Sequence, residues 1–273
     1  ELVGIAPLYQ DGSTIGLAGG EEIADFLDVI ALPGHEQAVA DATIDVVEQS
    51  GAEVGTFRNL RASSTCYLTL VDAARRRGFD VQVEQEDVSP CLRLPTSWEA
   101  YQQECLSRKD RHELRRKLRR LHSAGHVTWR YTDDLTRLEQ DIADYIRLHR
   151  LSDLEKSQFM TAQMEEWFRA LARTFVPTGQ MRLYFLELDG QRVAGTICFI
   201  YNNQLLLYNS GYDPAFASLS VGLALKAYSI YDAIESGLEV FDFLQGSESY
   251  KYDLGATDAP IYHVQLARKP AGA

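Results

Sequence analysis

The sequence predicts a mixed α/β fold made of two consecutive regions, on the basis of two patterns. Short apolar segments that end at Gly, Pro, Asn or Asp are typical of strands, and segments in which apolar residues recur every three or four positions are typical of helices. The chain alternates between these patterns, as mixed sheets flanked by helices do. Pro95 and Thr96 mark a change of region, so we expect domains at residues 1–95 and 96–273.

The first region is predicted to be a sheet with two helices. Its expected strands are residues 2–9, 14–17, 26–32, 54–60, 81–86 and 91–94. Apolar residues at helical spacing predict a helix over residues 38–49, which stops at Gly51 because glycine accepts the backbone conformation that ends a helix. A second helix over residues 65–77 stops at Gly78 in the same way.

The second region is predicted to begin with two helices. Thr96 and Glu99 have the spacing of a capping box, in which a hydroxyl and a carboxylate satisfy N–H groups at a helix start. The most basic stretch, residues 108–120, has leucines at i, i+4 and i+7, which predict an amphipathic helix. Beyond it, the expected strands are 127–131, 181–189, 192–201, 205–212, 239–244 and 261–267, and the expected helices are 135–148, 161–175 and 221–235.

The composition argues against several classes of protein. The chain has 273 residues and a formal net charge of −12, whereas general nucleic-acid binding needs a surplus of Lys and Arg. No apolar run reaches the roughly 18 residues that cross a bilayer, and no signal peptide is visible. The four cysteines have no metal-binding or redox spacing, so we expect no metal and a reducing, cytoplasmic location.

Four segments of the chain resemble the conserved blocks of a known family. They read SRKDRHELRRKLRRL (107–121), LHRLSDLEKSQFM (148–160), YNSGYDPAFASLSVG (208–222) and FDFLQGSESYKYDLG (241–255). With the order of elements after residue 127, they resemble acyltransferases of the GNAT superfamily, in the bacterial CelD-like (cellulose-biosynthesis-type) branch that is related to Fem-type aminoacyl ligases. The resemblance implies tandem GNAT-like mixed sheets flanked by helices, with the first half truncated at its N-terminus.

The resemblance also implies a reaction and a co-substrate. A GNAT enzyme moves an acyl group, here most simply acetyl, from acyl-CoA to an amine, without a metal. The implied acceptor is a small molecule, glycan or peptide of envelope polysaccharide or peptidoglycan-related metabolism. Two alternatives stay open: a Fem-type ligase that uses aminoacyl-tRNA, and a non-catalytic protein that keeps the fold and binds a partner.

The cofactor site is predicted where the strand at 205–212 meets the helix that begins near Ser220. A helix N-terminus offers N–H groups and the positive end of its dipole to a phosphate. We expect the strands that end near Gly211 and Leu244 to separate and admit the donor between them. The alternative is an ordinary helix with Ser220 as its N-cap. The predicted cofactor-binding residues are Tyr212, Ser218, Ser220, Val221 and Gly222.

Three residues are candidates for catalysis. Lys251 resembles the lysine in the F-K-x-x-F-G block of Fem-type ligases, which implies that it stabilises the oxyanion or an acceptor carboxylate. Tyr250 is a candidate to protonate the departing thiolate. Asp242 shares a strand face with two apolar residues, so we expect partial burial and a role either as the base or as a cap for the turn at 245–249.

The predicted substrate-binding residues lie in two places. The basic stretch contains eight of the 27 Lys and Arg residues, which is either a solvated helix face or a surface for an anionic partner, with Arg111, Arg115 and Arg116 as its contacts. Such a partner is a cofactor phosphate, a nucleotide-linked sugar, a lipid-linked precursor or a tRNA acceptor end. The other candidates are His149, Asp213 and Glu248, with a structural histidine and a turn as the alternatives for the first two.

Overall fold

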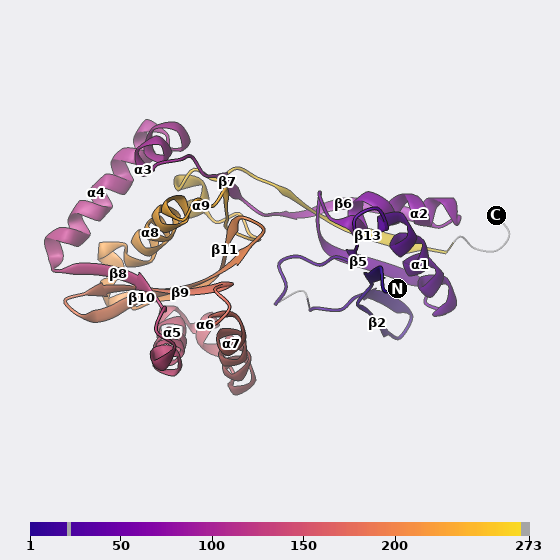
Figure 1. Ribbon diagram of the computed structural model, residues 1–273, viewed down its shortest axis with the longest axis horizontal. Helices are drawn as coiled ribbons and strands as arrows, with labels where there is room; N and C mark the ends of the chain where they lie inside the picture. Colours follow the sequence, from indigo (N-terminus) through magenta and orange to yellow (C-terminus); the bar gives the residue numbers. More distant parts are fainter. Residues whose placement is uncertain (21–22, 269–273) are drawn as a thin grey trace. The chain divides into compact units, whose positions relative to one another are not determined.

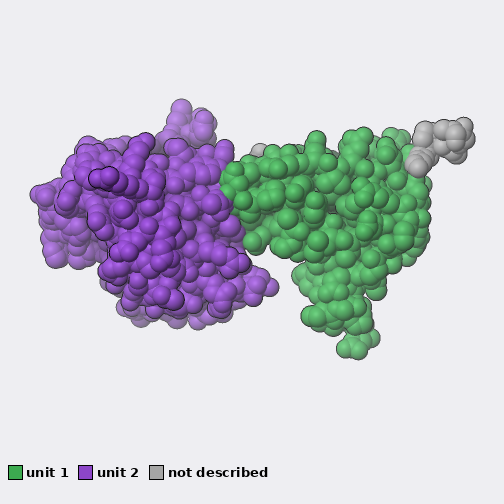
Figure 2. Space-filling model, turned by 90° about the horizontal axis from the view of Figure 1, so that it is seen from above, with its two compact units in different colours: residues 1–89, 258–273 green, residues 90–257 purple. Residues whose placement is uncertain are grey.

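The computed structural model describes residues 1–20 and 23–268, which form two compact units (Figure 2). Unit 1 contains residues 1–89 and the chain from residue 258 onward, and unit 2 contains residues 90–257. The structure therefore divides the chain between residues 89 and 90 rather than at Pro95, because the strand at 91–93 pairs within unit 2. The last strand returns to unit 1, a long-range pairing that local patterns do not reveal.

Unit 1 is a five-stranded sheet with the order β2-β3-β5-β13-β6, accompanied by a two-stranded ribbon of β1 and β4. The last strand, β13, lies between β5 and β6 and is antiparallel to both. Its elements are β1 (Gly4–Ile5), β2 (Leu8–Asp11), β3 (Thr14–Leu17), β4 (Ile30–Ala31), α1 (Glu36–Gln49), β5 (Val54–Arg61), a π-helical turn (Cys66–Leu70), α2 (Val71–Arg76), β6 (Asp80–Val88) and β13 (Pro260–Ala267).

Two of the strands predicted for unit 1 differ in the structure. Residues 2–9 do not form one strand, because Pro7 has no N–H to donate and the chain breaks there into β1 and β2. The strand predicted at 26–32 is reduced to the two residues of β4. The Asp28 carboxylate instead accepts hydrogen bonds from the N–H groups of Thr65 and Cys66, so this segment supports the start of the next helix.

Unit 2 is built on a six-stranded sheet with the order β7-β12-β11-β10-β9-β8. All neighbouring strands are antiparallel except β11 and β12. The turn at Asp189–Gly190 joins β9 and β10 with positive φ at both residues, as its sequence predicts. The strands are β7 (Cys91–Arg93), β8 (Val127–Tyr131), β9 (Met181–Leu188), β10 (Gln191–Tyr201), β11 (Gln204–Tyr212) and β12 (Val240–Asp242).

Helices cover both faces of this sheet (Figure 1). On one face, α4 and α8 pack against the core that contains Leu121, Ala227 and Phe241, and on the other, α5 and α7 enclose Tyr145 and Phe168. The helices are α3 (Trp98–Ala100) with a π-helical turn (Tyr101–Cys105), α4 (Arg108–Ala124), α5 (Leu138–Ser152), α6 (Leu154–Phe159), α7 (Ala162–Phe175), α8 (Val221–Glu235) and α9 (Ser249–Asp253). The predicted mixed α/β fold is confirmed.

Helix starts in unit 2 follow the expected capping chemistry with one correction. The capping box at Thr96 and Glu99 does not form, because Ser97 occupies the extended cap position and its hydroxyl accepts the N–H of Ala100 at 3.1 Å. Ser107 caps α4 by accepting the N–H of Asp110 at 3.1 Å. The short helices α6 and α9 and the 3₁₀ segment Pro214–Leu219 were not predicted.

Candidate functional site

An opening in the unit 2 sheet is the centre of the candidate site. The parallel strands β11 and β12 pair over only three positions, which end at Leu206 and Asp242, while β11 continues to Tyr212. After Asp242 the chain leaves β11, and the N–H of Phe243 donates to the carbonyl of Pro90 instead. The two strands therefore separate as expected from the sequence.

A cavity of about 360 Å³ lies at this opening. Its walls come from the end of β11, the first turn of α8 and the segment that leads into α9. Predicted site residues that line it are Tyr212, Ser220, Val221, Gly222, Glu248 and Tyr250. Most of the predicted cofactor-binding residues thus meet at one place, whereas Ser218 is exposed on the 3₁₀ segment and does not line the cavity.

The N-terminus of α8 borders the cavity without a side-chain cap among the described residues. Ser220 adopts a left-handed conformation with φ of 57°, and its hydroxyl accepts a hydrogen bond from Arg120 of α4 at 3.0 Å. Ser220 therefore occupies the N-cap position of α8, but its side chain does not cap the helix as an ordinary N-cap does. First-turn N–H groups of a helix have no partner within the helix, so residues 221–223 present donors and positive dipole to the cavity.

Two of the predicted catalytic residues support the loop behind the cavity. The carboxylate of buried Asp242 accepts the N–H of Leu244 at 2.9 Å, one residue before the turn at 245–249 that it was expected to cap. The ammonium of buried Lys251 donates to the carbonyls of Leu244, Gln245 and Gly246 at 2.6 to 2.9 Å. Neither side chain lines the cavity. Their catalytic roles stay predictions, and the contacts show that both hold the chain between β12 and α9.

Tyr250 and Glu248 are the predicted residues whose side chains meet the cavity from the α9 side. Burial raises the pKa of the Tyr250 hydroxyl, which therefore keeps its proton at neutral pH. Glu248 is exposed, and its carboxylate pairs with the ammonium of Lys251 at 2.9 Å. The lysine thus orients the acidic residue that faces the cavity.

His149 and Asp213 have structural contacts. His149 is buried on α5 beside the rings of Tyr145, Phe159 and Phe168. Burial, and then the positive charge of Lys156, lowers its pKa to about 4, so the ring is neutral at pH 7. The Asp213 carboxylate accepts the N–H of Ala215 at 3.0 Å. Both arrangements match the structural alternatives drawn from the sequence.

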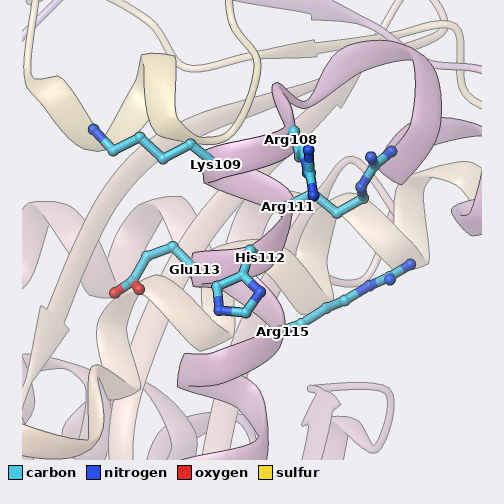
Figure 3. A pocket seen from close by; sticks show the side chains of 6 residues that line it. All are labelled: Arg108, Lys109, Arg111, His112, Glu113 and Arg115. Carbon is cyan, nitrogen blue, oxygen red and sulfur yellow. The ribbon is translucent and has the colours of Figure 1, made fainter.

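The basic helix α4 lines a separate, open pocket of about 760 Å³. Figure 3 shows Arg111 and Arg115 extending to one side of the helix and Lys109 and Glu113 to the other. Arg111 and Arg115 also bond Gln102, at 3.2 and 2.7 Å. Arg116 pairs with Glu113 and is not part of the lining. This pocket and the cavity at α8 share no lining residue.

Five cavity residues were not predicted, and three of them are polar: Lys156, Ser210 and Lys226. Lys226 is buried on α8 and donates to the hydroxyl of Ser210 at 3.1 Å, and Lys156 of α6 donates to the carbonyl of Ser210 at 2.7 Å. The signal for Lys226 is in the sequence, because it is the single charge within the apolar run LALKAYSI. Lys156 lies within a family-like block, but no pattern indicates its role.

Part of the chain matches the model of a known protein family. Residues 108–252, more than half of the chain, match the model of the family described as "Acetyltransferase (GNAT) domain". This chain belongs to the GNAT acetyltransferase family. The GNAT match begins at α4 and ends within α9, so it includes every residue that lines the cavity.

Solved structures resemble the GNAT chain along almost its whole length. The C-terminal domain of a putative lysylphosphatidylglycerol synthetase from Agrobacterium fabrum has a TM-score of 0.66 and 11% identity, over 94% of this chain and 79% of that one. L-PGS from Bacillus licheniformis has a TM-score of 0.62 and 12% identity (97% and 81%). FemX has a TM-score of 0.62 and 10% identity (96% and 85%). These likenesses show a shared fold of tandem GNAT-like domains.

Three further findings concern sequence relatives, membrane-spanning helices and metal ligands. A search of curated protein sequences gives no significant match. Among residues 1–20 and 23–268, no helix is long and apolar enough to span a membrane. Within the same residues, no group of three or more His, Cys, Asp and Glu side chains is arranged to hold a metal ion.

Proposed function

We propose that this GNAT chain is an N-acyltransferase that moves an acyl group, most simply acetyl, from acyl-CoA to an amine. The observation that carries the proposal is the cavity where β11 and β12 separate, bordered by the uncapped first turn of α8. Its volume of about 360 Å³ lies in the range of small-molecule sites. The phosphates of the donor bind at the α8 N-terminus, and the thioester extends toward Tyr250.

The reaction needs a neutral amine and a stabilised leaving group. An amine with the pKa of a lysine, about 10.4, is mostly protonated at pH 7 and must lose a proton before it attacks. A C–N bond then forms, the C–S bond of the tetrahedral intermediate breaks, and the thiolate takes a proton. In the proposed site, Glu248 holds the acceptor's ammonium, which gives its first proton to solvent. Tyr250 protonates the thiolate and regains a proton from the attacking nitrogen, which loses its second proton as the amide forms.

Asp242 and Lys251 act as positioning residues in this proposal. They hold the chain between β12 and α9 through hydrogen bonds to Leu244, Gln245 and Gly246. That chain carries Glu248 and leads to Tyr250. A change at Lys251 therefore lowers activity by displacing the cavity wall.

The acceptor and the branch of the family are also proposals. The segments at 208–222 and 241–255 support the bacterial CelD-like branch, and with it an amine in a glycan or peptide of envelope polysaccharide or peptidoglycan-related metabolism. An anionic acceptor suits the positive side chains around the cavity and along α4. A cytoplasmic location follows from the use of acyl-CoA.

A second candidate is a Fem-type ligase that takes an aminoacyl group from tRNA. The likeness over nearly the whole chain to FemX and to a domain of a putative lysylphosphatidylglycerol synthetase supports it. The pocket on α4 also supports it, because arginines such as Arg111 and Arg115 suit phosphate groups. In this candidate the nucleic acid contacts α4 and its aminoacyl end enters the same cavity.

The test is the response of the melting temperature to the two donors. Millimolar acetyl-CoA should raise the melting temperature by roughly 5 to 10 °C if it exceeds its Kd about 100-fold. The control is Gly222→Asp, which places a carboxylate in the first turn of α8. An acidic residue there stabilises the helix but repels a phosphate, so the variant should stay folded and lose the response to acetyl-CoA. The three atoms nearest to a Cβ at this position all belong to Tyr212, the nearest at 3.5 Å.

A transfer assay separates the two candidates. Acetylation of an amine by the wild type, and not by Gly222→Asp, supports the proposed function. No thermal response to acetyl-CoA, combined with transfer from an aminoacyl-tRNA, would replace it with the second candidate.

A further inference from the structure

The cavity beside α8 contains more positive charge than its own residues balance. Of the residues that line it, Lys156 and Lys226 are basic and Glu248 is acidic. Glu248 is already paired with Lys251 at 2.9 Å. Asp153, the other carboxylate that acts on Lys156, caps α6 by accepting the N–H of Lys156 at 2.8 Å. In a chain with a net charge of −12, this concentration of lysines indicates a site for an anion.

The ammonium of Lys226 has unused hydrogen-bonding capacity. The residue is 8% exposed, and its side-chain nitrogen lies 4.8 Å from the centre of the Tyr250 ring. An ammonium has three N–H donors, and among the described residues Ser210 is its hydrogen-bond acceptor, at 3.1 Å. Lys251, by contrast, is buried with three carbonyls around its nitrogen. Burying an ammonium that has a single acceptor costs free energy unless a ligand supplies the missing acceptors.

The two cavity lysines meet at the same residue. Lys156 donates to the carbonyl of Ser210 at 2.7 Å, and Lys226 donates to its hydroxyl. Burial lowers the pKa of both amines, and for Lys226 the positive charge of Lys156 is the second cause, so its pKa falls to about 8. An anion that contacts both ammonium groups would remove this repulsion and supply the missing acceptors.

We propose that Lys156 and Lys226 form an anion subsite that binds a carboxylate or phosphate group of the acceptor. The assignment to the acceptor rests on the proposed function, in which the donor phosphates bind at the α8 N-terminus. Lys226 contacts Tyr250, where transfer takes place, whereas Arg120 contacts Ser220 at the helix start. The acidic group bound at the lysines is therefore close to the reacting amine. The acceptor class is an amine that carries a carboxylate or phosphate a few bonds from its nitrogen.

The test uses the full chain and two simple probes, inorganic phosphate and acetate, titrated at constant ionic strength. The subsite predicts saturable binding of at least one probe, measured by calorimetry. Lys226→Met and Lys156→Met should each weaken that binding about 10-fold or more, because each removes a charged hydrogen-bond donor. Glu248→Gln should strengthen it a few-fold, because it removes a competing carboxylate. Arg75→Met, which removes one exposed positive charge from unit 1, should not change it.

Proton uptake distinguishes the subsite from a general effect of charge. An anion at Lys226 raises its pKa from about 8, so binding at pH 8 should take up about half a proton in the wild type and less in Lys226→Met. The groups that act on Lys226 are Lys156, Cys198, Glu248 and Lys251. Burial raises the pKa of the Cys198 thiol and of the Tyr250 hydroxyl, so both are already protonated at pH 8.

The outcomes separate this inference from the proposed function. The titrations with phosphate and with acetate show which of the two acidic groups fits the subsite. Unchanged binding and proton uptake in Lys226→Met, or no saturable binding in the wild type, would overturn the inference and leave acetyl-CoA binding to be judged on its own test. If the chain binds the anion probe but its melting temperature does not respond to acetyl-CoA, the inference is supported and acyl-CoA is rejected as the donor.

Discussion

Two buried lysines of unit 2 show how the partners of a side chain separate a structural role from a functional one. Lys251 and Lys226 are both less than one-tenth exposed. The ammonium of Lys251 contacts three backbone carbonyls, so its charge stabilises a loop. The ammonium of Lys226 contacts one hydroxyl and borders a cavity. Burial alone therefore does not identify a functional group, whereas incomplete hydrogen bonding beside a cavity does.

His149 should make the stability of the protein fall on mild acidification. Its pKa is about 4 in the folded chain and about 6.5 in the unfolded chain. As the pH falls below 6.5, the unfolded chain takes up a proton that the folded chain does not, so the free energy of unfolding falls until about pH 4. Between pH 7 and pH 5 the free energy of unfolding should therefore fall by about 2 kcal/mol more in the wild type than in His149→Phe. Urea denaturation at the two pH values measures this difference.

The matched control for His149 is His112, which is exposed on α4. His112→Phe should leave the difference in unfolding free energy between pH 7 and pH 5 as it is in the wild type. An equal effect of the two substitutions would mean that burial of the His149 ring is not the cause of the acid sensitivity.

The residues of the site were predictable where they follow one another in the chain. Tyr212, Ser220 and Gly222 lie where a strand ends and a helix begins, a junction that local patterns locate well. Lys156 and Lys226 were not predicted, because they meet at Ser210 only through the packing of α6, α8 and β11. Asp242 was proposed for catalysis from its strand position and Lys251 from the family resemblance. The contacts of both depend on a loop conformation that the sequence does not reveal.

At the scale of elements, the close approach of α5 to β11 depends on Gly211. A Cβ at this position would lie 2.5 Å from both the Cα and the backbone nitrogen of His149. These are backbone atoms, so Gly211→Ala can be accommodated only by moving α5 away from the sheet. The expected loss is about 1–3 kcal/mol in the free energy of unfolding, measured by chemical denaturation.

Gly222→Ala is the matched control for that substitution. A Cβ there meets the Tyr212 ring at 3.5 Å, an ordinary contact, and alanine is the better helix former. The free energy of unfolding should therefore stay the same or rise slightly. A loss comparable to that of Gly211→Ala would show that the packing of α5 on β11 is not what the glycine at 211 protects.

Long elements with a clear apolar period were predicted, whereas the two short helices α6 and α9 were not. The hairpin of β9 and β10 and the helices α4 and α8 run for eight to 17 residues, long enough for apolar periodicity to be clear. Helix α6 has six residues and α9 has five, less than two turns each. The place of β13 between β5 and β6 was also beyond prediction, because it pairs with residues about 170 to 210 positions earlier in the chain.

At the scale of the whole molecule, positive charge gathers in unit 2 although the chain is acidic. Eight of the 27 Lys and Arg residues lie at 108–120 in α4, Lys156 and Lys226 line the cavity, and Lys251 pairs with Glu248, which lines it too. The binding chemistry proposed for the chain is thus contained in one unit. Unit 1 contributes none of the residues that line the cavity at α8 or the pocket on α4.

Unit 2 should therefore fold and bind anions by itself. All six strands of its sheet lie within residues 91–242, and the N–H and C=O groups of Cys91 and Thr257 bond each other at 2.9 Å near the two ends. A chain of residues 90–257 should unfold cooperatively and bind the anion probe with the affinity of the full chain. Residues 1–89 should behave differently, because without β13 the sheet loses the strand between β5 and β6. Circular dichroism should show cooperative melting for 90–257 and none for 1–89, and the reverse result would contradict this division.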